Sequence, residues 1–425
     1  MKIYQFFPRL AADVSEWPAH ADRAAAMGFD VWYVNPLARR GASESLYSIA
    51  DAKSVDPRWA GRRADDPADS ERRLRAAFGD LRARGLRVMI DLVLNHTAAD
   101  APQVREHPEW YLWEDGAPAH PGCVEDGGRR VVWRDLARLD WTGARDPSGL
   151  HRWAASVIEY WADLGAEAFR CDAAYQVPAS AWRTLIADAR ARRPGLVFAA
   201  ETLGCTPSET LETARAGFDY VFNSAKWWDF ESPWLMEQYQ LTREICDSIA
   251  FPESHDTPRL AEESHGHEPL LKQRYLFAAL FSSGILMPVG FEFGFRRRLH
   301  VVDTRPSDWE APSLDLTDFI RRVNAVKEAH EVFRQDGPLQ LLPSLNPRVL
   351  LMWKSSRDGG QQAVLALNKD AWGYQSLYIE DPARLFQAAG PVRCVSPENP
   401  LAHVAVPFQY DLRPGEAVVL VAGRG

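Results

Sequence analysis

Short apolar segments alternate with longer amphipathic ones from the N-terminus to about residue 335. One of the short segments, Leu86–Leu94 (LRVMIDLVL), is almost continuously apolar, as expected for a strand buried on both faces of a parallel sheet. Apolar residues at helical spacing predict helices between the short segments, among them Glu16–Met27, Pro67–Arg84, Leu150–Leu164 and Ser180–Arg192. The predicted strands are Lys2–Phe7, Phe29–Asn35, Leu86–Leu94, Ala166–Cys171, Leu196–Ala200, Asp219–Asn223, Ser248–Pro252 and Ile285–Val289. Eight strands alternating with helices predict a (β/α)₈ TIM barrel.

Two regions depart from this alternation. Residues 98–149 follow the third strand and are rich in Pro, Asp, Gly and Trp, which predicts an excursion subdomain. After about residue 337 short strands separated by turn residues predict a small antiparallel β-sandwich, with strands at Val349–Trp353, Gln362–Asn368, Tyr374–Tyr378 and Ala417–Val421. We therefore expect a catalytic barrel over residues 1–97 and 150–337, an excursion over 98–149 and a sandwich over 338–425.

Composition narrows the classes of partner. The chain has 425 residues and a formal net charge of −9, which argues against nucleic acid or an anionic membrane as partner, because both need a basic face. Its five cysteines are odd in number and none forms a CxxC pair, so neither a disulfide framework nor a zinc site is predicted. No apolar run near the N-terminus suggests a signal peptide or a membrane span, and we expect a cytoplasmic protein. The oligomeric state stays open.

Chemically capable residues gather where the predicted strands end. Active sites of barrels of this type lie at that edge. Taken singly, an aspartate there is more often a helix cap, a histidine a core residue and an Arg-x-Asp pair a structural ion pair. As an ordered set on four strands they indicate a site: Asp91, Asn95 and His96 on the third, Arg170 and Asp172 on the fourth, Glu201 on the fifth, and Glu253, Ser254, His255 and Asp256 on the seventh.

These motifs resemble those of the α-amylase superfamily, glycoside hydrolase family thirteen. The resemblance lies in DLVLNHT on the third strand, FRCDAA on the fourth, AxE on the fifth and HD on the seventh. Weaker similarity is found in DLARLDW (Asp135–Trp141) and in LYSIADAKSVDPRW near the second strand. The resemblance covers barrel, excursion and sandwich.

The resemblance implies a retaining α-glycosidase or transglycosylase that acts on α-linked gluco-oligosaccharides or α-glucans. Asp172 would be the nucleophile and Glu201 the general acid/base, two carboxyl groups held close together as retaining chemistry requires. Asp256, His96 and His255 would bind hydroxyls of the reacting sugar, and Tyr47 would stack on it. Arg170 lies two residues before Asp172, hence on the same face of the strand, and would keep Asp172 ionised.

Some positions bear on specificity. Tyr175 and Gln176 stand where many relatives carry Lys-His, and Ser254 stands where many amylases carry Asn, which leaves the acceptor, water or sugar, open. Trp227 and Trp228 are sugar-stacking platforms if exposed and core residues if buried. The run Arg296–Arg298 is a candidate phosphate site, although a solvated loop paired with Asp303 and Asp308 is favoured.

Two alternatives remain beside this reading. One is a maltosyltransferase that uses maltose 1-phosphate, because GFDVWYVNPL resembles that subgroup. The other is a non-catalytic, amylase-like carbohydrate-binding protein, which the retained Asp172, Glu201 and Asp256 disfavour. No metal or cofactor is expected, although Asn95 is a calcium ligand in some relatives.

Overall fold

A computed structural model describes residues 1–61, 66–124, 130–388 and 390–423. Its centre is a closed barrel of eight parallel strands in the order β1-β16-β15-β14-β13-β12-β5-β2. All eight predicted strands are confirmed, each within a few residues of its expected bounds. They are β1 (Lys2–Phe6), β2 (Val31–Val34), β5 (Arg87–Leu92), β12 (Ala168–Cys171), β13 (Val197–Ala200), β14 (Tyr220–Phe222), β15 (Asp247–Ala250) and β16 (Gly284–Pro288).

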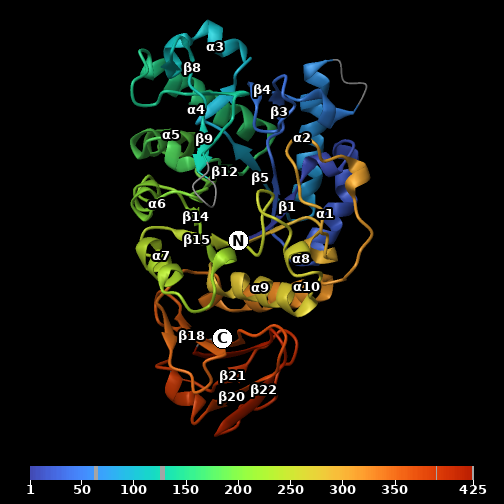
Figure 1. The fold of residues 1–425 in the computed structure, drawn as a ribbon, viewed down its shortest axis with the longest axis vertical. Helices are drawn as coiled ribbons and strands as arrows, with labels where there is room; N and C mark the ends of the chain where they lie inside the picture. The colour runs from blue at the N-terminus through green and yellow to red at the C-terminus, as the bar shows by residue number, and fades with distance from the viewer. Residues whose placement is uncertain (62–65, 125–129, 389, 424–425) are drawn as a thin grey trace.

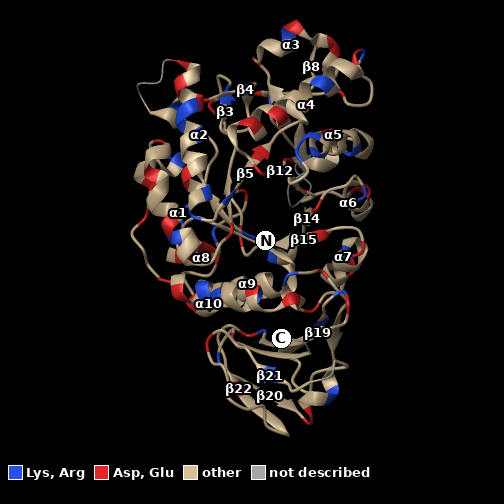
Figure 2. Ribbon diagram, turned by 180° about the vertical axis from the view of Figure 1, so that it is seen from behind, with Lys and Arg blue, Asp and Glu red and all other residues tan. Residues whose placement is uncertain are grey.

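Helices surround the barrel (Figure 1). A core of buried apolar side chains fills the space between strands and helices, and a second cluster, with Tyr33, Met89 and Phe222 among its members, fills the barrel interior. Figure 2 shows acidic and basic residues interspersed on outer helices such as α1 and α2. The helices are α1 (Trp17–Ala26), α2 (Pro67–Ala83), α4 (Pro147–Leu164), α5 (Ala179–Arg192), α6 (Pro207–Ala214), α7 (Trp234–Thr242), α8 (Leu260–Glu263), α9 (Glu268–Phe281) and α10 (Thr317–Ala329).

Helix α4 shows how local sequence fixes an element. Asp146 caps it by accepting a hydrogen bond from the backbone N–H of Gly149 at 2.8 Å, and Pro147 occupies the first turn, where no N–H is needed. Gly165 ends the helix with a φ of 118°, a left-handed conformation that glycine adopts readily. The Asp-Pro signal explains why the helix begins three residues before the predicted Leu150.

Small sheets lie at the barrel mouth and in the excursion. A hairpin of β3 (Ala38–Arg40) and β4 (Ile49–Val55) follows β2 and carries Tyr47 in its loop. In the excursion β6 (His96–Ala98) pairs with β11 (Leu136–Arg138), and residues 125–129 lie outside the described part. Figure 1 shows α3 and β8 at the end of the molecule opposite the C-terminal sheets. The remaining elements are α3 (Pro102–Glu106), β7 (Trp113–Glu114), β8 (Ala117–Pro118), β9 (Gly122–Val124) and β10 (Arg130–Val132).

The C-terminal region forms two antiparallel sheets with a buried apolar layer that includes Leu351, Val364, Leu377 and Phe408. One sheet has the order β17-β18-β19-β23-β21 and the other pairs β20 with β22. The four predicted strands are present, whereas β17, β21 and β22 were not predicted. Their bounds are β17 (Leu339–Leu342), β18 (Val349–Ser355), β19 (Gln361–Asn368), β20 (Gln375–Ile379), β21 (Arg393–Cys394), β22 (Phe408–Leu412) and β23 (Ala417–Gly423).

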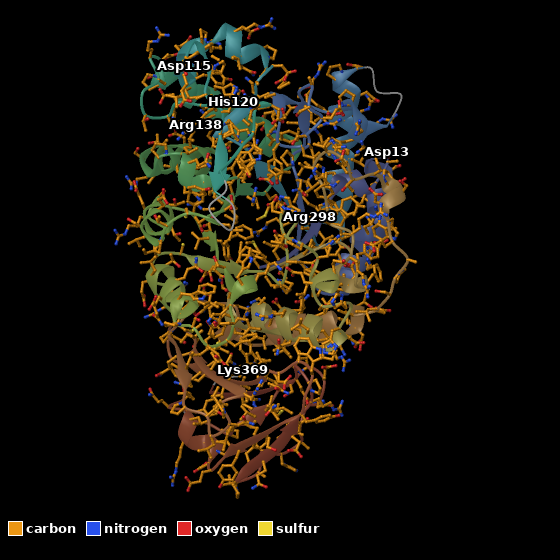
Figure 3. All side chains as sticks on the ribbon, viewed as in Figure 1. Asp13, Asp115, His120, Arg138, Arg298 and Lys369 are labelled. Carbon is orange, nitrogen blue, oxygen red and sulfur yellow. The ribbon has the colours of Figure 1, made fainter. Side chains whose placement is uncertain are left out.

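Apolar packing and charged contacts both join the sheets to the barrel, and Leu350, Met352 and Leu365 belong to the core cluster of the barrel. Figure 3 places Lys369 at the boundary between barrel and sheets, where its Nζ lies 2.9 Å from Glu231. Within the described residues, none of the helices is both long and apolar enough to cross a membrane.

Candidate active site

The carboxyl ends of neighbouring strands bring the predicted residues together. The N–H of Asp172 donates to the Leu92 carbonyl at the end of β5, and the N–H of Glu201 donates to the Cys171 carbonyl at the end of β12, both at 3.0 Å. These ladder bonds fix both carboxyl groups at the same edge of the barrel. A pocket there is lined by several of the predicted residues, Arg170, Glu201, Ser254, His255 and Asp256 among them.

Arg170 is the central cation of the site. Its Nη1 donates to Asp172 at 2.8 Å and to both oxygens of Asp91 at 2.9 and 3.1 Å, while its Nη2 lies 3.8 Å from Glu201. Asp91 is buried and accepts further hydrogen bonds from the phenols of Tyr33 (2.5 Å) and Tyr47 (2.7 Å). Asp91 thus anchors the same Nη1 that contacts Asp172.

Burial raises the pKa of both carboxyl groups, and the residues around them decide which one keeps a proton. Burial raises the pKa of Glu201 to about 7; Arg170 opposes the rise, and the charges of Asp172 and Asp256 add to it. Burial also raises the pKa of Asp172, but Arg170 at 2.8 Å and a hydrogen bond from Asn95 oppose that rise directly. Because Arg170 lies closer to Asp172, the shared proton resides on Glu201.

Backbone N–H groups orient Glu201. Ala173 donates to Oε2 at 2.7 Å and Leu203 donates to Oε1 at 3.1 Å. Ala173 has a φ of 39°, in the left-handed region that non-glycine residues seldom occupy. This bend directly after Asp172 turns the Ala173 N–H toward Glu201, so backbone strain is stored at the link between the two carboxyl groups.

Tyr47 and His255 form the wall next to Asp256. Their rings lie nearly parallel, 5.8 Å between centroids and 5° between planes, and the Tyr47 hydroxyl lies 2.7 Å from His255 Nε2. His255 Nε2 also lies 3.1 Å from Asp256. Burial lowers the pKa of His255, so its imidazole is neutral near pH 7. The carboxylate of Asp256 is more than half exposed and faces the mouth.

His96 lies behind Tyr47 and contacts its backbone. Its Nε2 lies 3.1 Å from the Tyr47 carbonyl, which can only accept, so Nε2 carries the proton and donates it there. Burial lowers the pKa of His96 to about 4, and the ring is therefore neutral. In the structure His96 supports Tyr47, and its role as a donor to a sugar hydroxyl stays a prediction.

The aromatic candidates separate into two groups. Trp227 is 50% exposed, and its ring meets the ring of Phe251, a pocket residue, at 88°. Trp228 is fully buried: it packs on Phe230 and Phe277 and donates from Nε1 to the Ser232 carbonyl at 2.7 Å. The prediction of Trp228 as a substrate-binding residue is wrong, because no face of its ring is open to a sugar.

Tyr175 and Gln176 lie beside the catalytic carboxyl groups, in the single turn Ala174–Gln176 that follows Asp172. Burial raises the pKa of Tyr175 to about 12, and nearby Glu201 adds to the rise. Gln176 accepts a hydrogen bond from Asn95 Nδ2 at 3.3 Å. Glu253, by contrast, is a structural residue that pairs with Arg259 at 2.7 Å away from the mouth.

The arginine run Arg296–Arg298 is exposed along its whole length, as the favoured interpretation expects. Arg297 pairs with Asp308 as expected, whereas Asp303 pairs with His300. Arg298 donates from Nη2 to the Asp256 carbonyl at 2.7 Å and lies over the middle of the barrel (Figure 3).

The residues around Asn95 give little support for a metal. Its Oδ1 is a buried oxygen without a partner, a feature that a cation could satisfy. Among the described residues, however, no group of three His, Cys, Asp or Glu side chains could hold an ion. The Nδ2 of the same amide is already used by Gln176.

Three contributors to the site were not predicted. Gln5, Tyr33 and Asn35 lie on or just after β1 and β2, inside the barrel mouth, and all are buried. Gln5 Nε2 lies 2.8 Å from His255 Nδ1 and donates to Asn35 at 3.1 Å. The only signal in the sequence was a polar residue near the end of an otherwise apolar strand.

Comparison with known proteins agrees with this architecture. Residues 1–120 match the family described as glycogen debranching enzyme, glucanotransferase domain. The α-1,4-glucan:maltose-1-phosphate maltosyltransferase of Burkholderia pseudomallei is 28% identical over 87% of this chain, and that of Myxococcus xanthus is 26% identical over 89%. The chain covers 33% and 60% of the lengths of these two relatives.

Solved structures show the same fold. An α-amylase from Lactobacillus plantarum superposes with a TM-score of 0.78 at 19% identity, covering 99% of this chain and 98% of the other. The resemblance to the α-amylase superfamily that the strand-end motifs indicated is therefore confirmed, in sequence by the maltosyltransferase relatives and in fold by the amylase.

Proposed function

We propose that this chain is a retaining α-glycosidase or transglycosylase that acts on α-linked gluco-oligosaccharides or α-glucans. The observation that carries the proposal is the position of Arg170 between two carboxyl groups, 2.8 Å from Asp172 and 3.8 Å from Glu201. One carboxyl group is held ionised and the other retains a proton near neutral pH, which is the division of labour that retaining chemistry needs.

The reaction then has two displacements. Asp172 attacks the anomeric carbon and forms a glycosyl ester, while Glu201 gives its proton to the departing glycosidic oxygen. In the second step Glu201 takes a proton from water or from a sugar hydroxyl, whose oxygen attacks the same carbon and releases Asp172. Two inversions give net retention, and Glu201 ends as it began, protonated.

Neighbouring groups favour the transition state. Asp256 faces the mouth with His255 and Tyr47 behind it, so we assign Asp256 to hydroxyls of the reacting sugar and the Tyr47 ring to its apolar face. Trp227 is an exposed aromatic residue against the pocket residue Phe251, and Tyr175 lies near Glu201, so both are available to a bound oligosaccharide.

Transfer to a glucan is the second candidate, with maltose 1-phosphate as donor. It is favoured by the maltosyltransferase names of the two relatives and by Arg298, whose guanidinium lies against the Asp256 backbone. Phosphate would then be the leaving group that Glu201 protonates.

One incubation separates the two. The protein is mixed with glycogen and either maltose 1-phosphate or maltoheptaose, and released phosphate, reducing ends and chain-length products are followed. Release of phosphate with extension of glycogen supports maltosyl transfer; new reducing ends from maltoheptaose support hydrolysis. The Asp172→Ala variant is the control, and equal turnover by that variant would refute the assigned nucleophile. A chain that binds glycogen but leaves every substrate intact would be the non-catalytic, carbohydrate-binding alternative.

Two accessory assignments complete the proposal. We give no step to a metal ion, because the carboxyl pair and Arg170 supply the acid, the nucleophile and the charge stabilisation. The cytoplasm is the proposed compartment, since Cys171, Cys205, Cys246 and Cys394 are free thiols, as expected in a reducing environment.

A further inference from the structure

Three arginines converge on Glu44, in the loop between β3 and β4 at the rim of the barrel mouth. Arg9 donates to the Glu44 carbonyl from the short turn Pro8–Leu10 that follows β1. Arg40 Nη1 lies 3.0 Å from the Glu44 carboxylate and 3.3 Å from its carbonyl. Arg58 Nη2 lies 3.1 Å from the same carboxylate. Glu44 itself has a φ of 62°, so the loop is held in a strained conformation beneath these cations.

The cations in this cluster outnumber the anions. Glu44 and Asp56 are the carboxylates that these arginines contact, and Asp56 is paired with Arg40 at 2.7 Å. A fourth cation, Arg305, donates only to the Val302 and Thr304 carbonyls. In the described part of the chain neither the Arg9 nor the Arg305 guanidinium contacts a carboxylate, although the Arg305 backbone N–H donates to Asp308 at 2.9 Å. Four guanidinium groups against two carboxylates leave an excess of two positive charges.

Arg9 is the member that most needs an anion. It is 3% exposed, and its Nε is buried without a hydrogen-bond partner in the described structure. Burial lowers the pKa of Arg9 to about 10; the charges of Arg40, Arg58 and Arg305 add to the effect, and the charge of Glu44 opposes it. A buried cation without a counter-ion is costly, so a ligand that supplies negative charge would stabilise this arrangement.

We propose that Arg9, Arg58 and Arg305 form a binding site for a phosphate dianion, either inorganic phosphate or the phosphate group of a sugar phosphate. Guanidinium forks match phosphate oxygens in geometry, and the excess of two charges matches a dianion. Arg58 and Arg305 are exposed and give the ligand access, while Arg9 forms the floor.

The site is separate from the catalytic carboxyl pair but adjoins Tyr47 along the chain. Glu44 precedes Tyr47 by three residues, and the Leu46 N–H donates to the Val301 carbonyl at 3.2 Å, which joins this loop to the segment that carries Arg305. A bound anion would therefore bridge the loop that carries Tyr47 and the loop that carries Arg305.

Calorimetric titration of the full chain tests the site without turnover. The Asp172→Ala variant is titrated with inorganic phosphate, glucose 1-phosphate and maltose 1-phosphate, at constant ionic strength. Arg58→Gln and Arg305→Gln are then added to this background, with Arg384→Gln, an exposed arginine of the C-terminal region, as the matched control.

We expect binding that weakens by about tenfold for each of the first two substitutions and does not change for Arg384→Gln. Equal affinity for inorganic phosphate and sugar phosphates identifies a site for the phosphate group alone; binding of the sugar phosphates only identifies a sugar-phosphate site. The absence of binding, or binding indifferent to Arg58 and Arg305, overturns the proposal. The catalytic proposal is unaffected by either result, because Asp172→Ala binds without reacting.

Discussion

The Tyr47 hydroxyl lies 2.7 Å from His255 Nε2 and 2.7 Å from Asp91, and these two contacts fix the tautomer of the histidine. Asp91 accepts from Arg170 on both oxygens, as a carboxylate does, so Tyr47 must donate its single proton to Asp91. The phenol oxygen can then only accept from His255, whose proton therefore resides on Nε2. The unprotonated Nδ1 is left to accept from the Gln5 amide at 2.8 Å.

Gln5 is thus predicted to be a positioning residue for His255. Gln5→Met removes the donor to Nδ1 without adding a charge. We expect kcat/KM to fall roughly fivefold to 150-fold, which corresponds to about 1–3 kcal/mol, because a buried acceptor loses its partner. Gln5→Glu should favour the other tautomer of His255, because a carboxylate at this position accepts a hydrogen bond from Nδ1–H. Nitrogen chemical shifts of the His255 ring distinguish the two tautomers directly.

The exposed Gln409 on β22 provides the matched control for Gln5. Gln409→Met should change neither the kinetics nor the ring shifts. If Gln5→Met lowers thermal stability but leaves kcat/KM and the His255 shifts of the folded enzyme unchanged, Gln5 is only a structural residue.

The pH dependence should be controlled by Glu201. Its raised pKa of about 7 means that the proton needed by the leaving group is present below pH 7 and is lost above it. We expect kcat/KM for a maltooligosaccharide to fall about tenfold per pH unit on the alkaline side of this value. The fluoride ion of an α-glucosyl or α-maltosyl fluoride needs no protonation to depart, so kcat/KM for such a donor should fall less on the alkaline side.

Glu201→Gln sharpens this comparison. The variant should lose oligosaccharide activity, retain formation of the glycosyl intermediate from the fluoride, and transfer the sugar to azide without the limb near pH 7. The exposed Glu380→Gln should behave as the parent enzyme. The same alkaline limb with both donors would assign that pKa to a group other than Glu201.

The sequence was sufficient for the barrel and for the carboxyl pair, for a physical reason. Parallel strands buried on both faces form recognisable apolar runs, and the residue after each run must lie at the common mouth, as Asp172 and Glu201 do. It was not sufficient for Gln5, whose partner His255 lies 250 residues away. Nor could it separate Trp227 from Trp228, because adjacent residues in an irregular segment have no periodicity that tells an exposed ring from a buried one.

These two tryptophans give opposite predictions. Trp227→Ala removes an exposed ring. It should raise KM for long maltooligosaccharides roughly fivefold, which corresponds to about 1 kcal/mol, and leave the stability of the protein unchanged. Trp228→Ala should destabilise the protein by about 3–5 kcal/mol because it opens a cavity against Phe277, with KM of the folded enzyme unaltered. Oligosaccharide kinetics and urea unfolding on both variants check this. If Trp227→Ala leaves KM unchanged at every chain length, Trp227 does not bind the substrate.

Asp336 should be a principal stabiliser of the junction between barrel and sandwich. Its Oδ2 accepts from the N–H and the hydroxyl of Ser248, both at 2.6 Å, its Oδ1 accepts from the Ser283 N–H at 2.7 Å, and Lys354 Nζ lies 3.8 Å away. Asp336 and Lys354 are both 1% exposed. Asp336→Ala leaves a buried cation and the N–H groups of Ser248 and Ser283 without this partner, so we expect a loss of about 3–5 kcal/mol in the free energy of unfolding. The exposed Asp303→Ala, measured by the same urea titration, should change it by less than about 0.5 kcal/mol.

A double-mutant cycle separates the charge from the hydrogen bonds. Adding Lys354→Met to Asp336→Ala removes the unpaired cation and should restore part of the lost stability, while the serine N–H groups remain unsatisfied. Strict additivity of the two substitutions would show that Lys354 and Asp336 act independently across their 3.8 Å separation, and that Asp336 stabilises the junction through Ser248 and Ser283 alone.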